Sequence, residues 1–144
     1  MKTIISSIFV LLLFTSCQVG PEPVNYGSDH CQYCSMTIVD KQYASEIVTK
    51  KGKVYKFDAI ECMINYHKEH PDQEVAMFLV SDFKDPGKLI SAPPATFLLS
   101  DNIASPMAAN IAGFSSEEAA RKTQTEFGGE LFSWDSLLIY LNNQ

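Results

Sequence analysis

An apolar run at the start of the chain fixes where the folded part can begin. Lys2 precedes Ile4–Phe14, eleven residues in which only Ser6 and Ser7 are polar. A helix needs about 20 residues to cross a bilayer, so this run is too short to span one. A charged residue followed by a short apolar segment is typical of a removable export signal. We therefore expect residues 1–16 to be removed, which leaves a mature chain of about 128 residues, the length of one domain.

The residues at the end of this run predict a lipid anchor. The sequence Leu13-Phe14-Thr15-Ser16-Cys17 resembles the lipobox of bacterial lipoproteins, with Phe14 in place of the usual aliphatic residue. Fatty acylation of Cys17, for example with palmitate, would hold the protein on a cell-envelope membrane, facing the periplasm or another extracytoplasmic side. An ordinary secretory signal followed by a chance cysteine is the alternative. Residues 17–29, rich in Gly, Pro and polar side chains, are predicted to be a flexible tether.

Composition and motifs narrow the classes of function. The chain is 46% hydrophobic and 19% charged, which is ordinary for a globular domain. Removal of Lys2 with the signal changes the net charge from −6 to −7, so nucleic acid is not an expected partner. The sequence has no serine nucleophile elbow, P-loop, dinucleotide fingerprint or His-Glu-x-x-His motif. Hydrolase or nucleotide chemistry therefore has no support in the sequence.

The pattern of short strands and helices predicts an α+β fold. The predicted strands are residues 36–39, 43–49, 53–57, 74–80, 88–90, 96–99, 110–114 and 130–132. The predicted helices are 58–70, capped by Asp58, a second that follows the capping box at 115–118 and ends at about Phe127, and 134–141, capped by Ser133. The order strand-strand-helix-strand occurs twice. It predicts two small lobes, at about residues 30–85 and 86–144, within one domain at 30–144.

Two cysteines and a methionine lie within a six-residue segment, Cys31-Gln-Tyr-Cys34-Ser-Met36. If this segment enters the first strand, Cys34 and Met36 share a face because side chains two residues apart point to the same side. Thiolate and thioether are soft ligands that select Cu(I) over hard or borderline cations. The segment therefore predicts a Cu(I) site built on Cys34 and Met36, with Cys31 as a helper or transfer ligand.

Two other functions share the Cys-x-x-Cys spacing and stay open. With Cys17 acylated, three thiols remain, and an odd number excludes a complete disulfide framework. A structural zinc site needs a second pair of ligands, and downstream the sequence offers Cys62, His67 and His70. A thioredoxin-like redox site places its first cysteine at a helix N-terminus, whereas β-prone residues 37–39 follow here.

Further donors are weaker candidates. Met107 lies in a stretch of small residues that resembles a turn, where a thioether has little packing role, so it is the expected third ligand. Asp58 and Cys62 are four residues apart on one helix face and, with Met63 and His30, form a secondary candidate set. Buried Cys and Met most often fill cores, which favours packing for Cys62 and Met63.

Taken together, these residues resemble the NosL family of copper-binding lipoproteins. The matching parts are Cys17, the Cys31–Met36 segment, Phe57-Asp58-Ala-Ile-Glu-Cys62-Met63, Ser105-Pro106-Met107, Ile111-Ala-Gly-Phe114 and Gly128-Gly129-Glu130. Ser35 stands where the family has glycine, and Ala108-Ala109-Asn110 replaces a stretch that usually contains glycine.

This resemblance implies a fold of two strand-strand-helix-strand lobes, shared with the organomercurial lyase MerB. It also implies a carrier that delivers Cu(I) to a periplasmic client or membrane assembly, such as that of nitrous oxide reductase, and catalyses no reaction.

Overall fold

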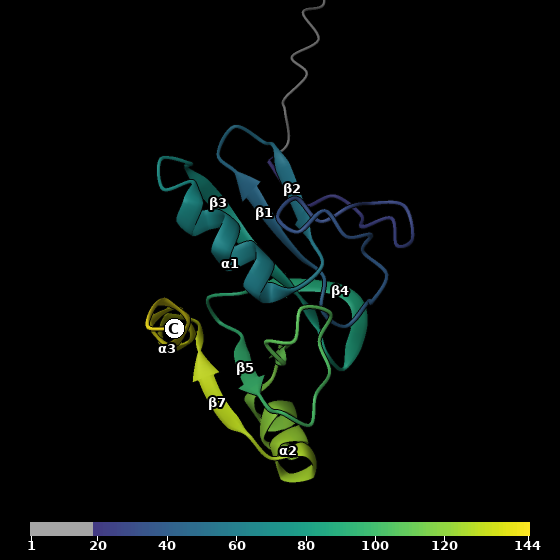
Figure 1. The fold of residues 1–144 in the computed structure, drawn as a ribbon, viewed down its shortest axis with the longest axis vertical. Coiled ribbons are helices and arrows are strands. Elements are labelled where there is room, and N and C mark those ends of the chain that lie inside the picture. The colour runs from purple at the N-terminus through teal and green to yellow at the C-terminus, as the bar shows by residue number, and fades with distance from the viewer. Residues whose placement is uncertain (1–18) are drawn as a thin grey trace, which may run out of the picture.

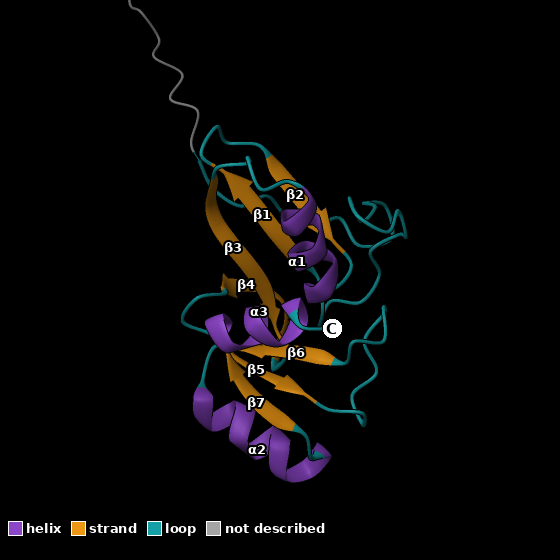
Figure 2. Cartoon of the chain, turned by 60° about the vertical axis from the view of Figure 1, so that its left-hand side comes forward, coloured by secondary structure: helices purple, strands orange, loops and turns teal. Residues whose placement is uncertain are grey.

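A computed structural model describes residues 19–144; the predicted signal and Cys17 lie outside the described residues. Seven strands form one sheet in the order β2-β1-β3-β6-β5-β7, with β4 also paired to β3 (Figures 1 and 2). The strands are β1 (Ser45–Thr49), β2 (Val54–Phe57), β3 (Val75–Asp82), β4 (Asp85–Ser91), β5 (Thr96–Leu99), β6 (Ile111–Phe114) and β7 (Glu130–Ser133). The helices are α1 (Ile60–Glu69), α2 (Glu117–Phe127) and α3 (Trp134–Asn142). The predicted α+β class is confirmed.

The first half of the sheet is an antiparallel hairpin extended by β3. β1 pairs with β2 on one side and with β3 on the other, both antiparallel. Gly52 has φ +81° in the turn between β1 and β2, a conformation that glycine adopts at little cost. α1 covers one face of this half, where Ser45 Oγ donates a hydrogen bond to the Ala59 carbonyl oxygen at 3.0 Å. β4 pairs with β3 and so adds to the same half.

The second half is joined to the first by one short parallel contact. β5 pairs antiparallel with β6 and β7, and β3 meets β6 in parallel where Asp82 pairs with Gly113. Successive side chains of β5 point to opposite faces of the sheet and enter two different hydrophobic cores. Phe97 belongs to the larger core, which includes residues of α1 and α3. Leu98 belongs to the smaller core, which includes Ala120 of α2. The helices therefore lie on both faces of the sheet. None of the helices in residues 19–144 combines the length and apolarity that crossing a bilayer requires.

The predicted strand at 36–39 and the predicted cap of α1 differ from the structure, and the bounds of several other strands shift by one to three residues. No strand forms at 36–39; Thr37 makes a single isolated bridge to His30. α1 begins at Ile60 and not at Asp58, and its N-cap, Ala59, has no side-chain hydrogen bond. By contrast, Ser133 caps α3 as predicted, with a reciprocal bond to Ser136. The Asp58 side chain is buried beside the helix start, where it makes no cap.

The segment before residue 30, predicted as part of a tether, lies against the sheet from Val19 onward. Val24 and Tyr26 pack against the larger core. Lys56 of β2 reaches across to this segment, and its ammonium group lies 2.8 Å from Asp29 Oδ2. Burial of apolar side chains and a partly buried ion pair both favour a fixed position for this part of the chain.

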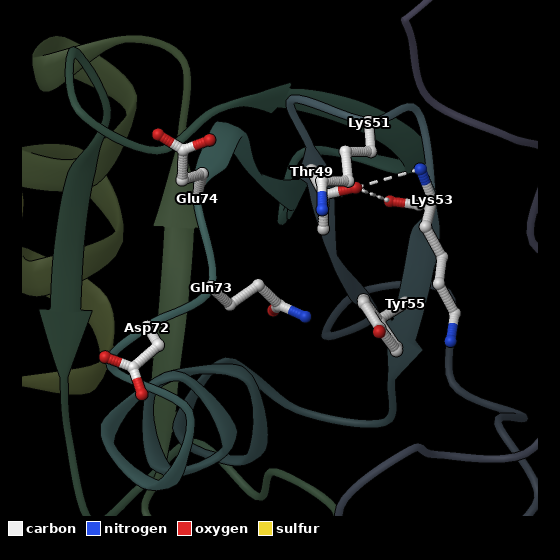
Figure 3. Close-up of a pocket in the computed structure, with 7 residues that line it drawn as sticks. All are labelled: Thr49, Lys51, Lys53, Tyr55, Asp72, Gln73 and Glu74. Carbon is white, nitrogen blue, oxygen red and sulfur yellow. Dashed lines mark hydrogen bonds between the residues drawn. The ribbon is translucent and has the colours of Figure 1, made fainter.

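A cavity of about 500 Å³ lies beside the β1–β2 hairpin (Figure 3). Its lining residues come from the hairpin and from the loop between α1 and β3: Thr49, Lys51, Lys53, Tyr55, Asp72, Gln73 and Glu74. The Lys53 ammonium lies 4.5 Å from the centre of the Tyr55 ring, a cation–π contact. The cavity is thus at the end of the first half where α1 finishes.

Candidate metal centre

The Cys-x-x-Cys segment forms a closed loop beside β2. The Cys31 N–H donates to the Met36 carbonyl oxygen at 2.8 Å, and the Ser35 N–H donates to the Cys31 carbonyl oxygen at 2.9 Å. Ser35 has φ +64°, a left-handed conformation that reverses the chain. The Gln32 N–H donates to the Lys56 carbonyl oxygen at 2.9 Å and holds the loop to the sheet.

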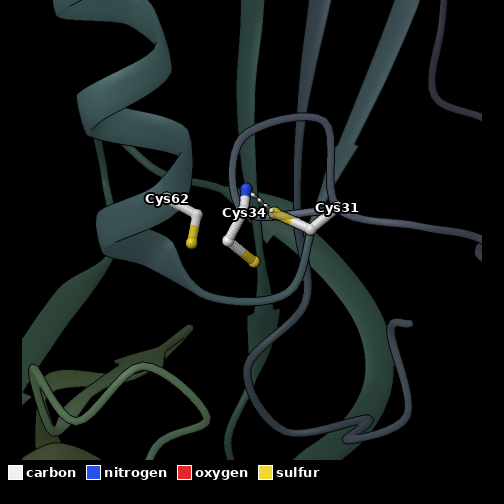
Figure 4. Close-up of side chains that lie close together, drawn as sticks. All are labelled: Cys31, Cys34 and Cys62. Atoms are coloured by element: carbon white, nitrogen blue, oxygen red, sulfur yellow. Dashed lines mark hydrogen bonds between the residues drawn. The ribbon is translucent and has the colours of Figure 1, made fainter. Parts of the chain in front are cut away.

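A third cysteine reaches this loop from the first turn of α1. The Sγ atoms of Cys31, Cys34 and Cys62 all lie within 4.8 Å of one another (Figure 4). Cys31 and Cys62 are buried, with 2% and 1% of their surface exposed, and Cys34 is partly exposed. All three are free thiols. Three sulfur atoms from two chain segments therefore face one space that a single metal ion could occupy.

The three thiols differ in acidity. Hydrogen bonding from the Cys62 thiol lowers the pKa of Cys31 to about 5, against the opposing effect of burial, and backbone amides including that of Cys34 add to the lowering. The Cys34 N–H lies 3.5 Å from Cys31 Sγ. The pKa of Cys62 is raised, chiefly by the same contact with Cys31, and that of Cys34 is raised by burial. These contacts favour the thiolate form at Cys31 and the protonated thiol at Cys34 and Cys62.

A buried carboxyl group lies next to the cluster. Neither oxygen of the Asp58 carboxyl has a hydrogen-bond partner among the described residues, and 1% of the residue is exposed. Burial, followed by the negative charge of Cys31, raises the Asp58 pKa. Both causes favour the neutral acid, because an unpaired buried carboxylate is costly.

Glu61 connects the cysteine cluster to the loop that carries Met107. Glu61 Oε1 accepts hydrogen bonds from the Ala109 N–H at 3.2 Å and from Ser105 Oγ at 3.4 Å. Its neighbour in the sequence is Cys62. Burial raises the pKa of Glu61, partly offset by these hydrogen bonds. The Met107 loop is thus fixed to the same turn of α1 that supplies the third thiol.

The two methionines predicted as ligands lie at the surface. Met36 is 49% exposed and Met107 is 38% exposed. The expectation that Cys34 and Met36 share a strand face is wrong, because residues 34–36 form no strand and Ser35 has a left-handed backbone conformation.

The remaining candidates divide between core and surface. Met63 is fully buried, as the packing interpretation predicted, and His30 is exposed next to Cys31. Cys62 is buried too, but its thiol also belongs to the cysteine cluster. The packing interpretation therefore covers only part of its role. The sequence offered Cys62 as a secondary donor, four residues after Asp58, although Asp58 lies before the start of α1 in the structure.

Comparisons with known proteins identify the fold and the family of this chain. No curated protein gave a significant match. Among solved structures, the crystal structure of the copper chaperone NosL from Shewanella denitrificans is similar to this chain, with a TM-score of 0.71 and 22% sequence identity. The match covers 82% of this chain and 95% of that chain, which confirms the predicted fold. The family model described as NosL matches residues 24–138, and the chain belongs to the NosL family.

Proposed function

We propose that this protein is a membrane-anchored carrier of Cu(I). The observation that carries the proposal is the cluster of three thiols from the 31–34 loop and from α1, whose sulfur atoms lie within 4.8 Å of one another. Thiolate and thioether donors favour Cu(I). Membership of the NosL family, and the description of a similar solved structure as a copper chaperone, support the same cargo.

The acidity of the thiols supports a site that loads and releases its ion. Cys31, with a pKa of about 5, supplies a negative charge to the monovalent ion without first losing a proton. Cys34 is the partly exposed thiol of the three and offers the point of entry. The exposed thioethers of Met36 and Met107 would then act as exchange ligands at the surface. Such a site holds and passes on an ion, and no bond of a substrate is made or broken.

The proposed setting is the extracytoplasmic side of a bacterial membrane, with acylated Cys17 as the anchor. The lipobox-like sequence before Cys17 supports this part of the proposal. The proposed client is a copper-accepting protein or membrane assembly such as that of nitrous oxide reductase, on the strength of the family resemblance. Nucleic acid has no part in this function, since the chain is acidic.

Titration of the reduced full chain with Cu(I), in competition with a chromophoric chelator, tests the carrier. We expect one ion per chain, with larger losses of affinity in Cys31→Ser, Cys34→Ser and Cys62→Ser than in Met36→Leu or Met107→Leu. Met77→Leu is the matched control, since Met77 is also exposed but lies in β3.

Tight Zn(II) binding that is unaffected by the methionine variants would instead indicate a structural zinc site. Catalysed disulfide exchange without Cu(I) binding would indicate a redox module. Either result would overturn the carrier.

A further inference from the structure

The β1–β2 hairpin lies at the point where the described chain begins. A Cβ atom added to Gly52, in the hairpin turn, would lie 3.9 Å from Val19 Cγ2. Gly20, Pro21 and Glu22 line a hollow together with Gly52. In Figure 1 the purple start of the described chain lies beside this hairpin, and Figure 2 shows the same arrangement from another side.

The segment that follows Val19 is fixed to the sheet. The Lys56 ammonium donates to the Pro23 carbonyl oxygen at 2.8 Å and forms ion pairs with Glu22 at 3.7 Å and Asp29 at 2.8 Å. Two residues of extended chain reach about 7 Å at most. A lipid attached to Cys17 would therefore be joined to the chain within this reach of Val19.

The hairpin turn presents positive charge at this place. Lys50, Lys51 and Lys53 are exposed in or next to the turn. Lys50 pairs with Glu74 at 3.3 Å, whereas Lys51 and Lys53 form no ion pair within residues 19–144. Three lysines within residues 50–53 thus lie beside the expected anchor, in a chain whose net charge is −6.

The cavity beside the turn has lysines and acids on facing sides. Lys51 and Lys53 line one wall, and Figure 3 shows Asp72 and Glu74 on the opposite side. The charge of Glu74 is offset by Lys50, so Asp72 is the unpaired acid that faces the two free lysines.

We propose that the turn of the β1–β2 hairpin, through Lys51 and Lys53, rests on the phosphate headgroups of the membrane and turns the cysteine cluster away from the bilayer. The inference depends on the proposed anchor at Cys17 but not on the identity of the metal. Lysines close to an anionic membrane surface are attracted to it within a Debye length, about 8 Å at physiological salt.

This orientation places the metal site at the far end of α1. Cys62 lies in the first turn of α1, and the cavity residues Asp72 and Glu74 follow its last turn. A helix of ten residues is about 15 Å long. With the hairpin on the headgroups, the cysteines lie about one helix length farther from the membrane, on the side open to a soluble partner.

Paramagnetic broadening of backbone amide signals tests this orientation. The lipidated full chain is placed in nanodiscs of phosphatidylcholine with or without phosphatidylglycerol, doped with a lipid whose headgroup carries chelated Gd(III). We expect stronger broadening at residues 49–54 and 72–74 than at Cys31, Cys34 and Cys62. The contrast should weaken without phosphatidylglycerol, at high salt, and in the double variant Lys51→Gln/Lys53→Gln.

The matched control is Lys84→Gln/Lys88→Gln, the same change of charge at the other end of β3, which should keep the wild-type pattern. Equal broadening of hairpin and cysteine amides, or a wild-type pattern in Lys51→Gln/Lys53→Gln, would overturn the orientation and leave the Cu(I) carrier intact. A wild-type chain that does not associate with the nanodiscs would overturn both the anchor and the orientation. The Cu(I) titration in solution decides the carrier separately.

Discussion

The thiol of Cys62, in the first turn of α1, lies within 4.8 Å of the thiol of Cys31, in the loop that precedes β1. The cluster therefore exists only when α1 is packed against that loop. Metal affinity and folding are coupled by this contact, because an unfolded chain does not hold the three sulfur atoms together.

The contact between Cys31 and Cys62 predicts an unusual thiolate in the metal-free protein. Ultraviolet absorbance of the reduced chain should show one thiolate forming at a pH of about 5, the pKa of Cys31. Cys62→Ala removes the main hydrogen-bond donor, so this transition should move toward the ordinary cysteine value of about 8.5. Cys34→Ser keeps that donor and should leave the transition in the acid range. A wild-type chain without any thiolate below pH 7 would contradict the assignment.

Ser35 should limit stability because its backbone is left-handed. At φ +64°, a residue with a Cβ atom is disfavoured by about 1–2 kcal/mol relative to the right-handed region. Ser35→Gly relieves this strain, and we expect a gain of up to about 1 kcal/mol in the free energy of unfolding, measured by urea denaturation. Ser28→Gly, at an exposed position without positive φ, is the control and should give no gain.

Sequence reasoning succeeded where local chemistry decides the structure. β5 was predicted with its observed bounds, and Ser133 was identified as the cap of α3, because strand propensity and capping act over a few residues. It failed at 36–39, where β-branched residues predict a strand but the turn at Ser35 and the docking of Gln32 on β2 impose a loop. A positive φ at a serine has no reliable signal in one sequence.

The candidate metal site was predicted only in part, because only part of it depends on local sequence. The Cys-x-x-Cys segment is visible as a local pattern. The approach of Cys62 depends on how α1 packs on the sheet, and no local pattern specifies it. Base rates for buried cysteine favoured packing, and the structure gives Cys62 a place in both the core and the cluster.

Glu61 should hold the Met107 loop in place. Glu61→Ala removes the acceptor for the Ala109 N–H, and an unpaired buried donor costs about 1–3 kcal/mol. We expect faster amide hydrogen exchange at residues 105–110 and lower stability. Glu117→Ala, which removes an exposed ion pair with Arg121, should cost less than about 1 kcal/mol. Unchanged exchange in the 105–110 loop would show that other contacts hold it.

Glu46 should make stability depend on pH. Burial raises its pKa to about 7, while cross-strand Lys56 opposes the shift and Glu22 and Asp29 add to it. A carboxyl with a raised pKa in the fold favours folding below its unfolded value of about 4.3, and this benefit is lost as the pH rises through about 7. The loss is on the order of 3 kcal/mol.

The test is the free energy of unfolding across this pH range. Glu46→Gln should be more stable than the wild type at pH 8 and similar to it at pH 4.5, because the amide carries no charge at either pH. An equal slope in both proteins would assign the pH dependence to other groups.

The junction between the two halves of the sheet has a consequence for how the protein can be divided. β3 and β6 meet at Asp82 and Gly113, and a Cβ atom on Gly113 would lie 2.9 Å from Val80 Cγ2. If the chain were cut between β4 and β5, β6 would lose its pairing with β3 at Gly113 and become an edge strand, and exposed edge strands favour aggregation. The half that contains the three cysteines would also lose the side chains of α3 that complete its core. A minimal metal-binding fragment therefore has to keep both halves, even though its three thiols come from one of them.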